Sequence, residues 1–336
     1  FNTATKHSYV YTSTGSSTGV KNSDAKIGDF WFSDVAHTAA TKRSTVFHAP
    51  IVAAPIAVLV NLPGKKNLYL SATTVAKIFS GDITKWNDPA IQSDNNRQIT
   101  TVIYRKDKNG NVAKDASGNP IVLTNRTLSA NYTLPNQSIR VIYRSDGSGT
   151  TGNFTAWLNG VAPSVWTKAG NNAFTTAFPT ANINAAGNIG RIVGAGQSQG
   201  VAGLAAKTKY SITYAEKNWG DTFGLRAAYV SNASGNFTYP DSAATSAFLG
   251  AAKQDANGIV SYDFNTKVAG AYTLGIISYM LIESEYADKT KGAAVKELAQ
   301  YIVSPACSGA KPSLGFVVVS GTFLDAANAQ IAKMNK

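Results

Sequence analysis

One segment of the sequence, Ile139–Leu158, combines residue types that bind a small anion. It reads as a β-branched strand, a glycine-rich turn and then an amphipathic helix, with Arg144 at the end of the strand. Ser148, Gly149 and Thr150 stand where the first helical turn begins. A helix N-terminus offers unpaired N–H groups and the positive end of the helix dipole, and an arginine adds a planar pair of donors for an oxyanion. These residues predict an oxyanion site, with phosphate as the favoured anion.

A second glycine-rich turn, Thr14–Lys21, also opens a short helix and places Ser16 and Ser17 at its start. A short strand, Asp29–Ser33, then ends at Asp34. A carboxylate repels an anion unless the ligand carries a proton that the carboxylate can accept, and monohydrogen phosphate has such a proton whereas sulfate has none. We therefore expect the two serines to donate to the ligand and Asp34 to select phosphate.

Asp146 lies two positions after Arg144, and we expect it to pair with the guanidinium and to orient it. Each residue alone has a structural explanation, because Asp34 could cap a turn and Arg144 could bridge strand ends. Their occurrence together with two glycine- and serine-rich helix starts favours a ligand site.

Two motifs admit enzymatic interpretations. The turn Gly147–Gly152 matches the G-x-G-x-x-G dinucleotide fingerprint, but Thr167–Phe174, about twenty positions on, holds no acidic residue for a ribose. Gly15–Gly19 matches the G-x-S-x-G turn of hydrolases, but His37 follows Asp34 too closely for the usual triad order. Three histidines and one cysteine also argue against a zinc site. We expect no catalytic residue, no cofactor and no metal.

Composition is typical of a folded protein, with 336 residues of which 44% are hydrophobic and 15% charged. The formal net charge of +12 is spread out, and the densest groups of lysines are Lys65–Lys66 and Lys106–Lys114. Nucleic-acid binding calls for tighter clusters, so the charge fits steering of a small anion better. The longest apolar run, Ala49–Leu62, contains two prolines and is too short to span a membrane.

Strand-like and helix-like segments alternate along the chain, which predicts an α/β architecture with largely parallel sheets. Ile51–Asn61 reads as a buried strand and Ser71–Phe79 as a helix that begins with a serine cap. Thr100–Tyr104 and Pro120–Thr124 flank a polar stretch, which predicts a β-hairpin insertion at about 100–124.

With these motifs in place, the chain resembles the phosphate-binding receptors of bacterial phosphate ABC importers (PstS-like), including their DING branch. Four segments carry most of the resemblance: RSDGSGTT (Arg144–Thr151), TGSSTGVK (Thr14–Lys21), DFWFSD (Asp29–Asp34) and IFSGDITKWNDPAI (Ile78–Ile91). Weaker matches follow at Gly200–Leu204 and Ile212–Tyr214, and the likeness as a whole spans nearly the whole chain in the order of the family.

The resemblance implies a two-lobed periplasmic-binding-protein-like fold of type II, each lobe a mixed sheet flanked by helices, with the ligand cleft at the hinge. Residues 1–63 plus 268–336 would form lobe I, and residues 64–267 lobe II. It further implies a receptor without catalytic activity, located in the periplasm, at the cell surface or outside the cell, whose partners are inorganic phosphate and the membrane permease. The implied ligand contacts are Ser16, Asp34, Arg144, Ser148, Gly149 and Thr150.

The family begins with a strand, a glycine-containing loop and a helix ahead of the segment that matches Phe1, and the printed sequence has no counterpart of these. Three explanations stay open: the segment was removed, it exists as a separate piece, or a neighbouring subunit supplies the strand by strand addition. The last explanation gives the alternative function, an extracellular structural or filament subunit that reuses the phosphate-receptor fold and assembles through this strand.

Overall fold

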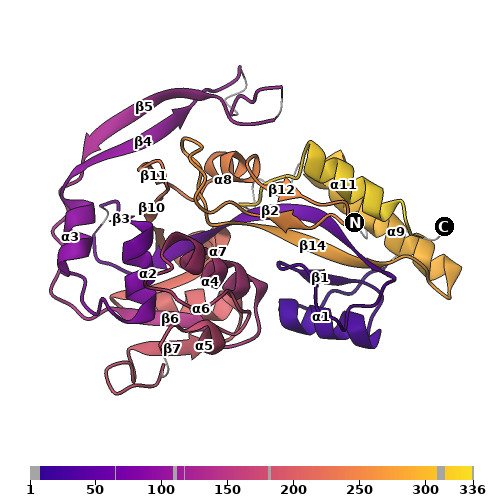
Figure 1. The fold of residues 1–336 in the computed structure, drawn as a ribbon, viewed down its shortest axis with the longest axis horizontal. Coiled ribbons are helices and arrows are strands. Elements are labelled where there is room, and N and C mark those ends of the chain that lie inside the picture. Colours follow the sequence, from indigo (N-terminus) through magenta and orange to yellow (C-terminus); the bar gives the residue numbers. More distant parts are fainter. Residues whose placement is uncertain are drawn as a thin grey trace. The chain divides into compact units, whose positions relative to one another are not determined.

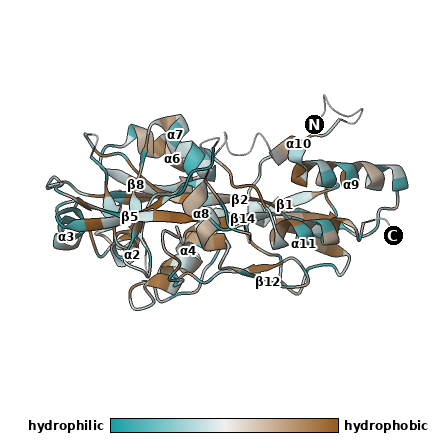
Figure 2. Cartoon of the chain, turned by 90° about the horizontal axis from the view of Figure 1, so that it is seen from above, coloured by the Kyte–Doolittle hydropathy of each residue, from teal (hydrophilic) through white to brown (hydrophobic). Residues whose placement is uncertain are grey.

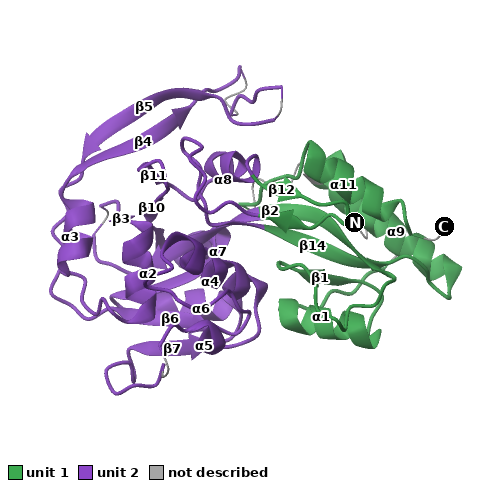
Figure 3. Cartoon of the chain, viewed as in Figure 1, with its two compact units in different colours: residues 1–53, 252–261, 277–336 green, residues 54–251, 262–276 purple. Residues whose placement is uncertain are grey.

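The computed structural model describes residues 8–64, 66–108, 112–116, 118–180, 183–308 and 315–334. The chain divides into two compact α/β units (Figures 1 and 3). Unit 1 consists of Phe1–Ala53, Ala252–Ser261 and Ile277–Lys336, and unit 2 consists of Ala54–Ala251 and Tyr262–Ile276. Residues 1–7, next to the point where the sequence is predicted to differ from the family, lie outside the described residues.

Unit 1 is built from a short sheet and the helices that cover it. Its helices are α1 (Ser16–Ala25), α9 (Lys289–Val303), α10 (Pro305–Ser308) and α11 (Thr322–Ile331). Its strands are β1 (Trp31–Ser33), the first half of β2 (Val46–Val60), β12 (Lys253–Gln254), β13 (Val260–Ser261) and most of β14 (Gly275–Glu283). β1 pairs antiparallel with β14, with Ser33 opposite Tyr279.

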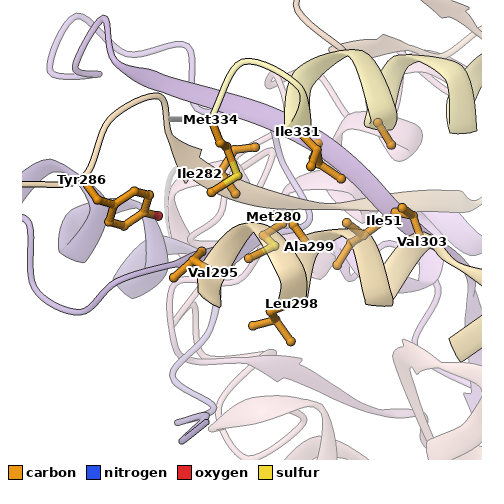
Figure 4. Packing of buried hydrophobic residues seen from close by; sticks show 12 residues of the cluster. Ile51, Met280, Ile282, Tyr286, Val295, Leu298, Ala299, Val303, Ile331 and Met334 are labelled. Atoms are coloured by element: carbon orange, nitrogen blue, oxygen red, sulfur yellow. The ribbon is translucent and has the colours of Figure 1, made fainter. Parts of the chain in front are cut away.

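The core of unit 1 lies between β14 and the helices α9 and α11 (Figure 4). α9 buries Val295, Leu298, Ala299 and Val303, a spacing of three and four residues that places them on one helix face. They pack with Met280 and with other apolar side chains of the same cluster. The opposite face of α9 is hydrophilic, and both kinds of residue are visible along it in Figure 2. No helix among the described residues has the length and apolar character needed to cross a membrane.

A close contact between α1 and β1 depends on Gly19. A Cβ added at Gly19 would lie 2.4 Å from the carbonyl oxygen of Phe32, so only glycine allows this approach. The short distance fixes the start of α1 next to the end of β1. Two segments that the sequence predicts to carry ligand groups are therefore neighbours in unit 1.

Unit 2 holds the remaining elements. Its helices are α2 (Ala72–Ser80), α3 (Pro89–Asn95), α4 (Gly149–Val161), α5 (Phe174–Ala177), α6 (Gln197–Lys207), α7 (Lys217–Phe223) and α8 (Ser242–Leu249). Its strands are the second half of β2, β3 (Tyr69–Leu70), β4 (Gln98–Tyr104), β5 (Val122–Ser129), β6 (Arg140–Arg144), β7 (Ile192–Ala195), β8 (Ser211–Glu216), β9 (Arg226–Ala227), β10 (Tyr229–Ser231) and β11 (Phe237–Thr238).

The main sheet of unit 2 positions the predicted anion loop. β6 pairs in parallel with β7 and with β8, and β8 pairs antiparallel with β2. Apolar side chains of these strands, including Leu59 and Ile142, form one buried cluster with Val201, Ala202 and Ala205 of α6. Because β6, β7 and β8 are parallel, their carboxyl ends lie at the same edge of the sheet.

The predicted hairpin insertion is a two-stranded antiparallel ribbon of β4 and β5, in which Thr100 faces Thr127 and Tyr104 faces Val122. Part of its tip, residues 109–111 and 117, lies outside the described residues. A small sheet with the order β11-β10-β3 lies beneath this hairpin in Figure 1.

The borders of the compact units differ from the predicted lobe borders near residues 63 and 268. They fall inside β2, between residues 53 and 54, and inside β14, between residues 276 and 277, and the segment 252–261 also joins unit 1. The second half of β2 belongs to unit 2 because Ile56 to Val60 pair with β8. The sequence shows the buried residues of β2 as one strand. Which part of β2 belongs to which unit depends on the strands with which each part pairs.

Candidate functional site

The predicted anion loop begins at the carboxyl end of β6. Arg144 is the last residue of this strand, and α4 begins at Gly149 after a four-residue turn. Ser148 caps α4, because its hydroxyl oxygen accepts a hydrogen bond from the N–H of Thr151 at 3.3 Å. The cap fixes the first turn of α4, whose amides and dipole favour an anion.

Arg144 is buried, with 5% of its surface exposed, and its guanidinium is held on two sides. Nε and Nη2 donate to the two carboxylate oxygens of Asp146 at 2.7 and 2.5 Å, and Nη1 donates to Ser198 Oγ at 2.8 Å. Asp146 also accepts the backbone N–H of Gln197 at 2.9 Å. Gln197 has a φ of 61°, an unusual value for a residue other than glycine and one that often marks a functional site. The guanidinium is thus oriented before any ligand binds.

The pKa values of this pair follow from burial and mutual contact. Burial opposes the charge on each group, but the hydrogen bonds between them dominate. They raise the pKa of Arg144 above its ordinary value and lower the pKa of Asp146 below its ordinary value. Both groups are therefore charged at neutral pH.

Thr150, in the first turn of α4, donates its hydroxyl proton to Glu216 at 2.6 Å. Glu216 ends β8, and Tyr214 of the same strand contacts the Thr151 hydroxyl at 2.8 Å. The hydroxyl of Tyr214 also accepts the backbone N–H of Arg144 at 3.2 Å. Residues at the ends of β6 and β8 therefore hold one another in place.

Unit 1 contains a second, smaller group around the start of α1. Ser16 is buried and its hydroxyl oxygen accepts the backbone N–H of Asp34 at 3.1 Å, so its own proton stays available for another acceptor. Ser278 of β14 donates to Asp34 Oδ1 at 2.5 Å. Gly15 precedes α1 with a φ of 82°, a conformation that favours glycine. Ser17 follows Ser16 in the first turn of α1.

The structure thus sorts the predicted site residues into two sets. We call Arg144, Asp146, Ser148, Gly149 and Thr150 of unit 2 the arginine set, and Ser16, Ser17 and Asp34 of unit 1 the aspartate set. The predicted pairing of Asp146 with Arg144 is present in the structure. The histidine weighed for a hydrolase triad, His37, is instead bonded through Nε2 to Asp24 Oδ1 at 2.7 Å.

Sequence reasoning missed four residues that hold these sets: Ser198, Tyr214, Glu216 and Ser278. The signal for three of them was the order of parallel strands, because residues at the carboxyl ends of β6 and β8 and at the start of α6 meet at one sheet edge. Within the described part of the chain, no three histidine, cysteine, aspartate or glutamate side chains cluster as metal ligands would.

The structure therefore combines sheets flanked by helices with a capped helix start next to a buried, oriented arginine. The chain belongs to the PBP superfamily, because the model of the PBP superfamily domain matches residues 1–306.

The relatives and solved structures agree with this assignment. The chain is similar to phosphate-binding protein PstS 3 of Mycobacterium tuberculosis, with 29% identity over 89% of this chain and 72% of the relative. It is also similar to a solved high affinity periplasmic phosphate-binding protein (PfluDING) bound with phosphate, with a TM-score of 0.66, 20% identity and coverage of 93% and 83% of the two chains. The phosphate binding protein of Stenotrophomonas maltophilia gives a TM-score of 0.64 at 18% identity over 94% and 85%. These matches confirm the predicted α/β fold of type II periplasmic-binding-protein kind.

Proposed function

We propose that this protein binds inorganic phosphate as the receptor of an ABC-class phosphate importer and acts outside the cytoplasm. The observation that carries the proposal is the arginine set, in which a buried arginine is oriented by Asp146 next to the capped start of α4. The names of similar proteins, phosphate-binding protein PstS 3 among them, support phosphate as the ligand.

In this proposal each set supplies groups that bind phosphate. Ser16, Ser17 and the α4 start donate hydrogen bonds, Arg144 neutralises charge, and Asp34 accepts the proton of the ligand. The hydroxyl of Thr150 donates to Glu216, so towards a ligand it can act only as an acceptor. A second acceptor of this kind also favours an anion that carries a proton over one that does not.

The proposal assigns binding and delivery, without bond making or breaking, to this chain. The relatives' names describe phosphate-binding proteins and give no support to the alternative of a filament subunit. The permease of the importer is the partner that the receptor assignment implies.

The test is isothermal titration of phosphate-free protein with phosphate and, in parallel, with sulfate at the same pH and ionic strength. We expect heat from a single site with phosphate and none with sulfate. A titration without heat from phosphate, or with equal affinity for the two anions, contradicts the proposal.

A further inference from the structure

Unit 2 contains a cavity of about 300 Å³ that lies away from the arginine set. Residues of the hairpin strands β4 and β5 line one side of it, and residues of β3, β10 and β11 and the segment before α8 line the other. Its volume is at the lower end of the range for small-molecule sites, roughly 300–1,000 Å³. All of its lining residues belong to unit 2, so the cavity is complete within one compact unit.

Four aromatic rings, those of Tyr69, Tyr229, Phe237 and Tyr239, line the wall that faces the hairpin. Tyr69 and Tyr229 lie 5.0 Å apart between ring centroids, Tyr229 and Tyr239 lie 5.1 Å apart, and Phe237 meets Tyr69 edge to face at 5.7 Å. Tyr69 and Phe237 are buried, whereas Tyr229 and Tyr239 keep part of their surface accessible. Tyrosines of this kind combine a flat apolar area with a polar hydroxyl at the edge.

The hairpin is fixed to this wall by a tyrosine of its own. Tyr104 of β4 lines the cavity and donates its hydroxyl proton to the carbonyl oxygen of Gly270 at 2.8 Å. The bond joins the insertion to a segment 166 residues away in the sequence. An insertion that only decorated the surface would not need such a tether, and with it the cavity keeps a defined shape.

Polar groups of both signs complete the lining. Asp241 accepts the N–H of Ala244 at 2.8 Å and remains open to solvent, and Arg126 enters from β5. The surrounding protein removes part of the hydration of Asp241 and raises its pKa, although the backbone N–H groups of Ala244 and Ala243 and the charges of Lys106 and Lys217 counteract this. Asn67 adds an amide that can donate and accept, whereas the hydroxyl of Thr238 donates to the carbonyl oxygens of Val230 and Ala271.

This combination excludes a simple cation cage. A cage for an ammonium group needs a negative charge that no neighbouring cation compensates. Here Lys106 and Lys217 both act on Asp241, and the ammonium of Lys217 lies 5.7 Å from the ring centroid of Tyr239, so a second cation would be repelled. A simple anion is disfavoured as well, because Asp241 lines the same space as Arg126.

A sugar ring can interact both with the aromatic rings and with the polar groups that line the cavity. Its C–H face is apolar and flat enough to stack on tyrosine, and each hydroxyl on its rim donates one hydrogen bond and accepts others. We propose that the cavity between the β4–β5 hairpin and the β11-β10-β3 sheet binds a neutral pyranose ring, by stacking on Tyr229 and Tyr239 and by hydrogen bonds to Asp241 and Arg126. This site is separate from the proposed phosphate site and does not depend on it.

Saturation-transfer NMR tests the proposal with the full chain and with methyl glucoside, methyl mannoside, methyl galactoside, maltose and cellobiose. We expect transfer to the ring C–H protons of at least one sugar at about 10 mM, since single-ring affinities fall in the millimolar range. Tighter binding of a disaccharide than of the methyl glycosides would identify the ligand as part of a chain, and the reverse order would identify a free monosaccharide. Absence of transfer for every sugar overturns the proposal.

Variants tie the binding to the cavity. Tyr229→Ala and Tyr239→Ala should weaken sugar binding at least tenfold, whereas Tyr132→Ala, a half-buried tyrosine of unit 2 outside the cavity, should leave it unchanged. Asp241→Asn keeps the cap of α8, because asparagine is also a good N-cap, and should weaken binding several-fold. The far-ultraviolet circular dichroism spectra and melting temperatures of the same variants should match those of the unaltered protein, which shows that they are folded without reference to phosphate binding.

Two further results contradict the sugar proposal. One is sugar binding of equal strength in Tyr239→Ala and in the unaltered protein. The other is transfer to tetramethylammonium, at the same concentration, with no competition from any of the sugars, which would identify the cavity as a cation site.

Discussion

The two sets of predicted ligand groups differ in burial and in the sign of the charge that they present. Arg144 in unit 2 is 5% exposed, and all three of its guanidinium nitrogens have hydrogen-bond partners at 2.5–2.8 Å. Asp34 in unit 1 is half-buried, and its carboxylate accepts from Ser278 at 2.5 Å. Unit 2 thus holds the positive charge of Arg144 in a fixed orientation. Unit 1 presents the carboxylate of Asp34, which attracts the ligand only where the ligand carries a proton. Affinity should therefore depend mainly on unit 2 and selectivity mainly on unit 1.

The largest effect is expected for Arg144→Lys. Lysine has a single point of charge and cannot reach Asp146 and Ser198 in the way that the planar guanidinium does. We expect phosphate affinity to fall about 1,000-fold, or roughly 4 kcal/mol, in isothermal titration. Arg140→Lys is the matched control, because Arg140 lies exposed on the same strand. If the phosphate affinity of Arg144→Lys stayed within threefold of the original, affinity would not depend mainly on Arg144 of unit 2.

The units should also differ in their response to acid. His48 in unit 1 is buried and accepts the backbone N–H of His37 at 2.8 Å. Burial, with Lys42 and His37 adding to it and Asp255 opposing it, lowers the pKa of His48 from 6.5 to about 4. The unfolded chain therefore binds this proton more readily than the folded chain between pH 6.5 and 4. The free energy of unfolding should fall as pH falls through this window, by up to roughly 3 kcal/mol.

Denaturant titrations at several pH values between 4 and 7 measure this loss. His48→Gln should flatten the pH dependence. Asp146→Asn in unit 2 is the contrasting variant: the pKa of Asp146 is lowered from 3.8, so its contribution is present above that value and disappears only at lower pH. Asp146→Asn should therefore change the level of stability and leave the slope between pH 6.5 and 4 as it was. An unchanged slope in His48→Gln would show that another group is responsible.

A smaller effect is expected for Asp34→Asn, and it tests selectivity. The amide oxygen can still accept from Ser278, but the side chain loses its charge and gains two donors. We expect phosphate affinity to fall about 30-fold, or roughly 2 kcal/mol, and sulfate binding to become measurable. Asp29→Asn is the control, since Asp29 is an exposed carboxylate of unit 1 that pairs with Lys291 at 3.1 Å. Phosphate preference as strong as before would contradict the role proposed for Asp34.

Local sequence predicted the arginine set well because its parts are close along the chain. Strand, turn and helix start follow one another from Arg140 to Thr151, and the pairing of Asp146 with Arg144 spans two positions. The aspartate set was also visible, since a serine-rich helix start and a short strand each have a local pattern.

The supporting residues could not be predicted in the same way. Glu216 lies 66 residues from Thr150, and Ser278 lies 244 residues from Asp34. Their positions depend on which strands pair, and a single sequence encodes pairing only through side-chain burial. The cavity beneath the hairpin has the same origin, because its rings come from β3, β10 and the segment before α8.

The discontinuity of unit 1 has a consequence for how the protein is made. About 240 residues, most of them in unit 2, lie between β1 and its partner strand β14 in the sequence. At a synthesis rate of roughly 5–20 residues per second, the first 53 residues wait more than about ten seconds for the strand that completes their sheet. Ala54–Ala251, which is most of unit 2, is synthesised during that interval, whereas the segment with Ser16 and Asp34 gains its partner strand only when β14 follows. The selective half of the proposed phosphate site is therefore the last to form.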